Sequence, residues 1–185
     1  MDKKRAKRLR KITSKAKKYC GYKNIKKEIK KTQKEKKGLT NHEITKMLKC
    51  SSRFIGCFSE DEVNSIKFQT FPVFLIVNID QSNMPGSHWI ALGIFNEKIE
   101  IFDSLGPDLF NWSRIPCQLL KLLHRLSITR KIIVSQRIQS DSSTFCGFYA
   151  VFYTLFRPFY SFNFLKKLFT KNLSANDKIL LKIFS

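Results

Sequence analysis

The chain has 185 residues, 43% of them hydrophobic, and a net charge of +21. This length predicts a single domain, and the hydrophobic fraction is too high for a chain that is disordered throughout. The N-terminal charges are not followed by an apolar run, and no apolar run reaches the roughly 20 residues that span a bilayer, so we expect neither a secretory signal nor a membrane span.

Residues 1–38 form the most basic part of the chain. They contain 18 of the 35 Lys and Arg residues but only three carboxylates, and so carry +15 of the total charge. Because little apolar area is available to offset backbone ordering, we predict a disordered arm. Its expected partner is nucleic acid, since neutralised phosphates release counterions. Nuclear import is a second use of the same charges, and a solvated tail or a partial helix around Ile25 and Ile29 is the plainer alternative. Membrane binding is not expected, because a regular apolar face is missing.

The five cysteines are an odd number without CxxC spacing, which indicates a reducing compartment rather than a disulfide framework. Cys50 and Cys57 follow His42, but the six residues between the two cysteines are not the spacing of a zinc knuckle. We therefore expect no metal site and interpret the cysteines, Cys146 excepted, as buried structural thiols.

The folded domain is predicted to comprise residues 39–185. It opens with Thr40-Asn41-His42-Glu43, which has the pattern of a capping box, before apolar residues at helical spacing. We expect His42 to face solvent in the first turn of this helix. A loop through Gly56 follows.

The rest of the domain alternates between strand and helix patterns. Residues 71–79 are apolar on both faces, as in a buried central strand. Residues 145–156 are apolar at nearly every position and too long for a strand, which predicts a helix buried on all sides. The fold class is α+β: a small, mostly antiparallel or mixed sheet packed by helices. The predicted strands are 71–79, 88–95, 98–102 and 131–138, and the predicted helices are 39–49, 118–126, 145–156 and 174–184.

Cys146 is the candidate nucleophile. It lies at the N-terminus of the predicted buried helix, where the helix dipole and free backbone amides stabilise a thiolate. A buried structural cysteine is the alternative. Gly147 argues against that alternative, because a glycine beside the sulfur costs helix stability and lets a substrate backbone approach closely.

His88 and Asp103 are the candidate proton carrier and its partner. A turn at Asn96-Glu97 joins their two strands, so that the numbers of facing residues add up to about 191 and residue 88 faces residue 103. A carboxylate beside the imidazole fixes its orientation and tautomer. Without His88, Asp103 would be read as a residue that initiates a turn.

Gln139 is the candidate oxyanion donor. It follows a strand and precedes a polar loop that returns to Cys146, so its amide and the Cys146 backbone N–H together can stabilise an oxyanion. Gln136 is a competitor for this role. Trp89 is interpreted as a wall of the substrate groove or as a core residue. A histidine, a carboxylate, an amide and a cysteine in this order indicate a thiol protease.

The combined motifs resemble the adenovirus protease (adenain) family and its relatives in virus-like DNA transposons, which share a fold with the SUMO-deconjugating proteases. The resemblance covers residues 40–157. The interval from Gln139 to Cys146 is similar to the adenoviral enzymes, whereas the Asp-Ser-Leu-Gly string is similar to the SUMO proteases. The motifs are Cys-x-x-x-Phe-Ile-Gly (50–56), Gly-Ser-His-Trp (86–89), Phe-Asp-Ser-Leu-Gly (102–106) and Gln-x6-Cys-Gly (139–147).

The resemblance implies a papain-like cysteine protease core with the catalytic cysteine at the N-terminus of a buried central helix. His88, Asp103, Gln139 and Cys146 are then catalytic, and Trp89 and Gly147 border a narrow substrate groove. The resemblance also implies DNA as an activator, with no required cofactor. Adenoviral enzymes anchor an activating peptide through a disulfide on the strand that leads to the glutamine, but residues 126–138 contain no cysteine.

We therefore expect a cysteine endopeptidase that cleaves viral or virus-like capsid and core precursors at glycine-containing sites during particle maturation. Its expected location is the virion and the host nucleus, and it is not expected to be secreted. We expect a monomer, with nucleic acid bound through the basic arm. Processing or deconjugation of SUMO-like or ubiquitin-like proteins is the alternative. A nucleic-acid-binding protein with a vestigial protease site is a third possibility.

Overall fold

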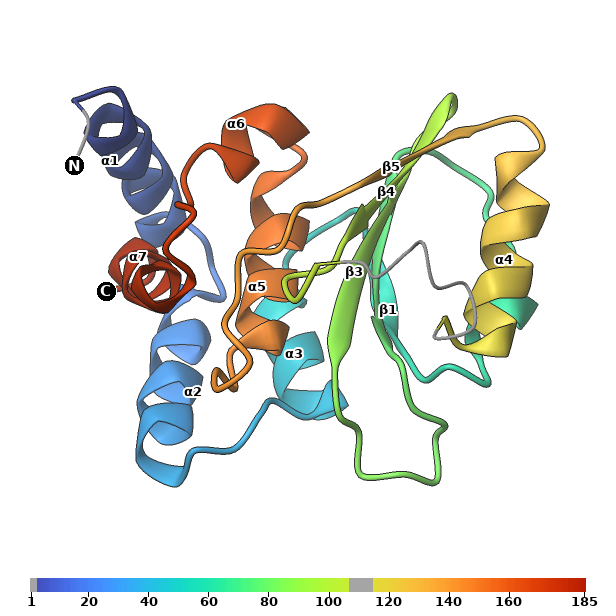
Figure 1. Ribbon diagram of the computed structural model, residues 1–185, viewed down its shortest axis with the longest axis horizontal. Helices are drawn as coiled ribbons and strands as arrows, with labels where there is room; N and C mark the ends of the chain where they lie inside the picture. The colour runs from blue at the N-terminus through green and yellow to red at the C-terminus, as the bar shows by residue number, and fades with distance from the viewer. Residues whose placement is uncertain (1–2, 107–114) are drawn as a thin grey trace.

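The computed structural model describes residues 3–106 and 115–185 (Figure 1). Within these residues, one mixed sheet has the strand order β1-β2-β3-β4-β5. The pairs β2–β3 and β3–β4 are antiparallel, whereas β1–β2 and β4–β5 are parallel. The strands are β1 (Phe54–Phe58), β2 (Val73–Asn78), β3 (Trp89–Ile94), β4 (Lys98–Phe102) and β5 (Lys131–Val134). The helices are α1 (Lys3–Lys17), α2 (Tyr22–Glu35), α3 (Asn41–Leu48), η1 (Val63–Ser65), α4 (Cys117–Ser127), α5 (Cys146–Phe156), α6 (Phe162–Lys166) and α7 (Leu173–Ile183).

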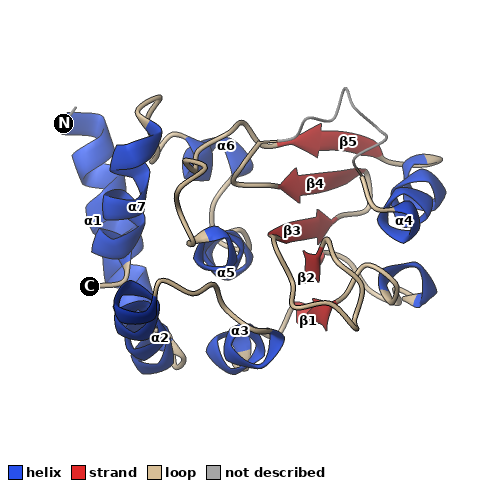
Figure 2. Ribbon diagram, turned by 60° about the horizontal axis from the view of Figure 1, so that its bottom comes forward, coloured by secondary structure: helices blue, strands red, loops and turns tan. Residues whose placement is uncertain are grey.

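The sheet is covered on both faces, with α5 on one side and α4 on the other (Figures 1 and 2). The interior strand β2 is buried at every position, because alternate side chains enter two separate cores. Phe74 and Ile76 belong to the α5 core, and Val73, Leu75 and Val77 belong to the α4 core. The predicted α+β class and the buried strand within 71–79 are confirmed.

Helix α5 lies at the centre of the molecule. Each of its eleven residues is buried, because the sheet packs on one side and the outer helices pack on the other (Figure 1). Helix α3 begins with the predicted capping box, in which the Thr40 hydroxyl accepts from the Glu43 amide and the Glu43 carboxylate accepts from the Thr40 amide. His42 is exposed, as expected. None of the described helices is both long and apolar enough to cross a membrane.

The prediction that residues 1–38 are a disordered arm is wrong for the described part, where α1 and α2 fold onto the domain. Their few apolar side chains recur at helical spacing and join the same core as α5, while the charges remain on the outer face. The sequence interpretation gave more weight to the charge content, and it considered a helix around Ile25 and Ile29 only as an alternative. No boundary therefore separates an arm from a domain at residue 38. The buried apolar side chains are Leu9, Ile12, Ala16, Ile25 and Ile29.

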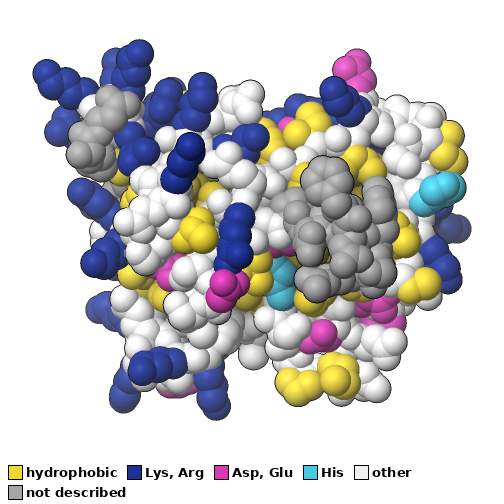
Figure 3. Space-filling model, viewed as in Figure 1, with side chains coloured by type: hydrophobic (Ala, Val, Ile, Leu, Met, Phe, Trp, Pro, Cys, Tyr) yellow, Lys and Arg dark blue, Asp and Glu magenta, His cyan; other side chains and the backbone are white. Residues whose placement is uncertain are grey.

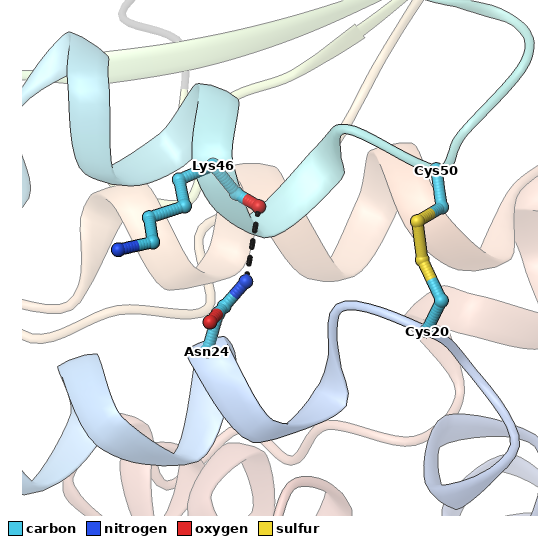
Figure 4. Close-up of a disulfide and its surroundings, with 4 residues drawn as sticks. All are labelled: Cys20, Asn24, Lys46 and Cys50. Atoms are coloured by element: carbon cyan, nitrogen blue, oxygen red, sulfur yellow. Dashed lines mark hydrogen bonds between the residues drawn. A yellow bond between two sulfur atoms is a disulfide. The ribbon is translucent and has the colours of Figure 1, made fainter.

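The interpretation of the cysteines also needs correction, because Cys20 and Cys50 form a disulfide (Figure 4). The bond ties the turn between α1 and α2 to the turn after α3. Nearby, the Asn24 side chain donates to the Lys46 carbonyl oxygen at 3.4 Å (Figure 4). Both bonded cysteines are exposed, as is Cys117, so these three are not interior thiols.

Besides α1 and α2, the sequence prediction missed β1, η1 and α6. Strand β1 passes through Gly56, which was interpreted as a loop, and it pairs with β2 around a register shift between Phe54 and Gly56. Because β1 is an edge strand, its side chains are half-buried or exposed and do not alternate between buried and exposed positions. Helix α6 is a single short turn capped by Ser161. Strand β5 ends at Val134, four residues earlier than the predicted strand at 131–138.

Candidate active site

His88 and Asp103 form a close pair, with 2.7 Å between Nε2 of the ring and Oδ1 of the carboxylate. The predicted pairing is correct in outcome but wrong in register. Ala91 faces Phe102 and Ile94 faces Ile99, so the numbers of facing residues add up to 193 rather than 191. His88 lies one residue before β3 and Asp103 one residue after β4, and the two side chains meet diagonally, within the reach of diagonal neighbours on one face.

Asp103 is fixed in place by its own turn and by β5. Its Oδ1 also accepts from the Leu105 amide at 2.9 Å. The Ser135 hydroxyl donates to the Asp103 carbonyl oxygen at 2.7 Å and accepts from the Asp103 amide at 2.9 Å. The carboxylate therefore has a set direction toward the His88 ring, as an orienting group requires.

Cys146 is the first residue of α5 and is 8% exposed. Its thiol lies close enough to the His88 ring to help raise the pKa of that ring. In the described part of the chain, no group accepts a hydrogen bond from the Cys146 backbone amide, and no side chain caps the helix. A free amide and the positive end of a helix dipole thus lie beside the sulfur.

His88 is held in its charged form. Burial of the ring lowers its pKa, but the hydrogen bonds and charges of Asp103 and Cys146 outweigh burial and raise the pKa to about 9. The charged imidazole therefore lies between a carboxylate and a sulfur. Cys57 has no such partner pair. Burial raises the pKa of its thiol to about 12, although a hydrogen bond with Thr45 acts to lower it, so this thiol is unreactive.

Gln139 is buried at 1% exposure and its side chain is held at both ends. Its Oε1 accepts from the Ser104 hydroxyl at 2.5 Å, and its Nε2 donates to the Ser143 carbonyl oxygen at 2.8 Å. The Ser104 bond fixes which end of the amide carries the N–H groups. One of the two N–H groups of Nε2 is then free for an oxyanion. Gln136, its competitor, is exposed beyond the end of β5.

Three residues that support this site escaped the sequence interpretation. Ser104 binds Gln139 through its hydroxyl, and its carbonyl oxygen accepts from the Ile138 and Gln139 amides at 2.9 and 2.8 Å. The buried Asn176 of α7 donates to the Ile138 carbonyl oxygen at 2.8 Å. Ser135 holds Asp103, as described above. Ser104 stands in the Asp-Ser-Leu-Gly motif and gave a usable signal, whereas Ser135 and Asn176 are recognisable only from the fold.

Trp89 was interpreted as a groove wall or a core residue and Gly147 as a border of the groove, and both are buried in this structure. The Trp89 indole N–H donates to the Leu39 carbonyl oxygen at 2.8 Å and the ring is 5% exposed. A Cβ at residue 147 would lie 3.0 Å from Leu39 Cδ1 and 3.2 Å from Trp89 Cδ1. Packing against Leu39 therefore accounts for the glycine, and close approach of a substrate is not needed to explain it.

The catalytic candidates come from separate elements but lie at one end of the sheet and of α5. His88, Asp103 and Cys146 form a connected set, and Gln139 is anchored to the residue that follows Asp103. Among residues 3–106 and 115–185, no three His, Cys, Asp or Glu side chains are grouped as metal ligands would be.

Similar solved structures include the crystal structure of the selenomethionine ASFV pS273R protease, at 22% identity and a TM-score of 0.48, covering 80% of this chain and 66% of that one. The SUMO protease Ulp1 with its catalytic cysteine oxidised to a sulfinic acid matches at 18% identity and a TM-score of 0.31, covering 61% and 54%. The C-terminal Ulp1 protease domain in complex with SMT3, the yeast ortholog of SUMO, matches at 18% and 0.29, covering 60% and 54%.

The chain therefore spans less than two thirds of the length of these three proteins. No protein-family profile and no curated protein matches the sequence. With such distant similarity, the chemistry of the site rests on its own geometry.

Proposed function

We propose that the protein is a cysteine endopeptidase. The observation that carries the proposal is the position of His88, whose ring bonds to Asp103 and interacts with the thiol of Cys146. This arrangement supplies a thiolate, a proton carrier and an orienting carboxylate in one connected set. The free amide at the start of α5 supplies a donor for the oxyanion.

In the proposed reaction, the Cys146 thiolate attacks the carbonyl carbon of the scissile peptide and forms a C–S bond. The negative charge moves to the carbonyl oxygen, where the Cys146 amide and Gln139 stabilise it. As the C–N bond breaks, the His88 imidazolium gives its proton to the leaving amine. A water molecule then attacks the thioester while His88 takes its proton, and the C–S bond breaks to release the acid and the thiolate.

Mutation of Gln139 is expected to slow this reaction. Gln139→Ala removes one oxyanion donor, so kcat should fall by on the order of 10²–10³. Ser104→Ala should lower kcat by a smaller factor. In the double variant it should lower kcat little beyond the effect of Gln139→Ala, because Ser104 acts through the glutamine. Steady-state kinetics of the two single variants and the double variant measure this coupling. An unchanged rate for Gln139→Ala would point to Gln136 or another donor.

The charge on His88 gives a prediction for pH. Its pKa of about 9 lies above the ordinary 6.5, so the stability from its ion pair is complete below about 6.5 and is lost as pH rises through 9. Cleavage should decline over the same alkaline limb, because deprotonated His88 has no proton for the leaving amine. NMR titration of the imidazole should give a midpoint near 9, and a lower one in Asp103→Asn. A wild-type midpoint at or below 6.5 would rule out the charged pair.

A second part of the proposal concerns the substrates that the enzyme cleaves. We propose cleavage at glycine-containing sites in viral or virus-like structural precursors, supported by the resemblance of the four sequence motifs. Processing of SUMO-like or ubiquitin-like proteins is the alternative, supported by the Asp-Ser-Leu-Gly string at 103–106. Location in the virion and the host nucleus, and a monomeric state, belong to the same proposal.

We further propose that nucleic acid assists the enzyme through the exposed cations of α1 and α2. Support comes from the +15 charge of residues 1–38 and from its position on the outer face of two folded helices. Deletion of these residues is not a clean test, because it would also remove buried side chains such as Ile12 and Ile25.

The proposed function is tested by profiling the cleavage sites of the purified full chain, with and without DNA, on a peptide library, a capsid precursor and a SUMO precursor. Cleavage of the capsid precursor at glycine sites supports the main proposal. Processing of only the SUMO precursor supports the alternative. If no polypeptide is cut under any of these conditions, the peptidase proposal fails.

A further inference from the structure

A cavity of about 410 Å³ lies between α1, α6 and the segment that follows β5, apart from the catalytic residues. We name it the α1–α6 cavity. Four of its seven lining side chains are cations, two are neutral amides and one is a phenylalanine, and none is a carboxylate. The residues are Arg5, Arg8, Gln136, Asn163, Lys166, Lys167 and Phe169.

The cations of this cavity have no carboxylate partner among the described residues. Arg8 and Lys166 lie over aromatic rings, and Nε of Arg5 is buried without any hydrogen-bond partner. Like charges around one hollow repel each other, and an unpartnered buried donor costs free energy. An anion in the cavity would relieve the repulsion.

The surroundings add to this attraction. Lys and Arg side chains crowd the part of the surface over α1, at the upper left of the view in Figure 3. The positive potential of such a surface raises the local concentration of anions. The cavity is the place on it where cations from two different helices and the amides of Gln136 and Asn163 line one hollow.

We propose that the α1–α6 cavity binds a compact polyphosphate anion. Phosphate oxygens accept forked hydrogen bonds from arginine and point-charge contacts from lysine, and the amide side chains add neutral donors. The volume is that of a small-molecule site, for which about 300–1,000 Å³ is usual, and suits a cluster of phosphates better than a length of duplex. Phosphate is the shared chemistry, whether it comes from a free polyphosphate or from a nucleic-acid backbone.

The walls of the cavity also touch the supports of the catalytic residues. Phe169 packs on Tyr149 and Phe152 of α5, with ring centroids 5.4 and 5.3 Å apart. Helix α6 packs through Phe162 on Phe102, next to Asp103, at 6.3 Å. Gln136 lies three residues before the candidate oxyanion donor. A bound anion is therefore placed to hold α6, α5 and the Gln139 segment together. This regulatory role rests on the proposed function, whereas binding of the anion does not depend on it.

The test is isothermal titration of the full chain with inorganic tripolyphosphate at 0.15 M salt, where loose surface binding is screened. The cavity variant is Arg5→Gln with Lys167→Gln, since neither side chain has a protein partner among the described residues. The control is Lys7→Gln with Lys27→Gln, which removes the same charge from exposed positions outside the cavity.

One tripolyphosphate per chain is expected, with affinity falling about tenfold for each cavity cation removed and less than about twofold in total in the control. Equal losses in the two variants, or no saturable binding, would overturn the proposal. A short DNA duplex is then tested as a competitor. If it displaces tripolyphosphate and binds the cavity variant more weakly than the wild type, nucleic acid is the phosphate source. If it does not displace tripolyphosphate, the source is a free polyphosphate.

The regulatory part has its own readout. Tripolyphosphate should raise the melting temperature of the wild type and of the control but not of the cavity variant, whatever the protein catalyses. If the peptidase proposal holds, it should also raise kcat in the same two proteins. Binding with no effect on kcat overturns the regulatory role alone. Absence of saturable binding by a wild-type protein that still cleaves peptides overturns the cavity alone.

Discussion

Cys146→Ala is expected to abolish peptide hydrolysis, with kcat falling by on the order of 10⁴–10⁶. The physical reason is that the thiolate forms the C–S bond on which both steps of the proposed reaction depend. The fold should persist, because alanine fits where the small, buried sulfur lies at the start of α5. The measurement is the rate of cleavage of a glycine-containing peptide, with circular dichroism to verify folding.

The matched control is Cys117→Ala, which removes an exposed free thiol at the start of α4. It should leave the rate within about twofold of wild type. Hydrolysis that continues at an appreciable rate in Cys146→Ala, in a preparation free of other proteases, would contradict the mechanism.

Glu100→Ala is expected to lower the free energy of unfolding by about 3–5 kcal/mol. The Glu100 carboxylate on β4 is completely buried and accepts two hydrogen bonds from Arg157, at 2.6 and 2.8 Å. It also accepts from the Tyr153 hydroxyl of α5 at 2.8 Å and pairs with Lys98. Alanine would leave the charge of Arg157 and the buried hydroxyl of Tyr153 without a partner between sheet and helix.

The prediction is measured by urea denaturation, followed by circular dichroism. Glu97→Ala is the control, because Glu97 is an exposed carboxylate in the same hairpin and should cost no more than about 0.5 kcal/mol. Burial alone would raise the pKa of Glu100, but Arg157 and Lys98 hold it below its ordinary value, so the contribution of this network should fade as pH falls through that pKa. Equal effects of the two substitutions would show that the network contributes little.

The parts of the fold that the sequence predicted well are those with a strong local pattern. The capping box at Thr40 and the apolar run of α5 each specify their element without help from distant residues. The disordered arm was predicted wrongly because its apolar positions are few. They form helices only by packing on α3, α5 and α7, and the Cys20–Cys50 disulfide joins parts of the chain that charge patterning does not connect.

The candidate site shows the same division. The sequence indicated the residue types and their order, and it brought His88 and Asp103 together despite an error of two in the strand register. It could not reveal that Ser104 holds Gln139, because that contact depends on how β4 and the segment after β5 meet. Gly147 was attributed to substrate approach because its real neighbour, Leu39, lies far away in the sequence.

The central claim is that Cys146 is a nucleophile activated by His88. It is tested most directly by treating the protein with an electrophilic peptide that ends in glycine and locating the adduct by mass spectrometry. We predict one adduct per chain, on Cys146, at a rate that falls at least about a hundredfold in His88→Ala. Labelling of Cys117 instead, or labelling of Cys146 at the same rate without His88, would contradict the claim.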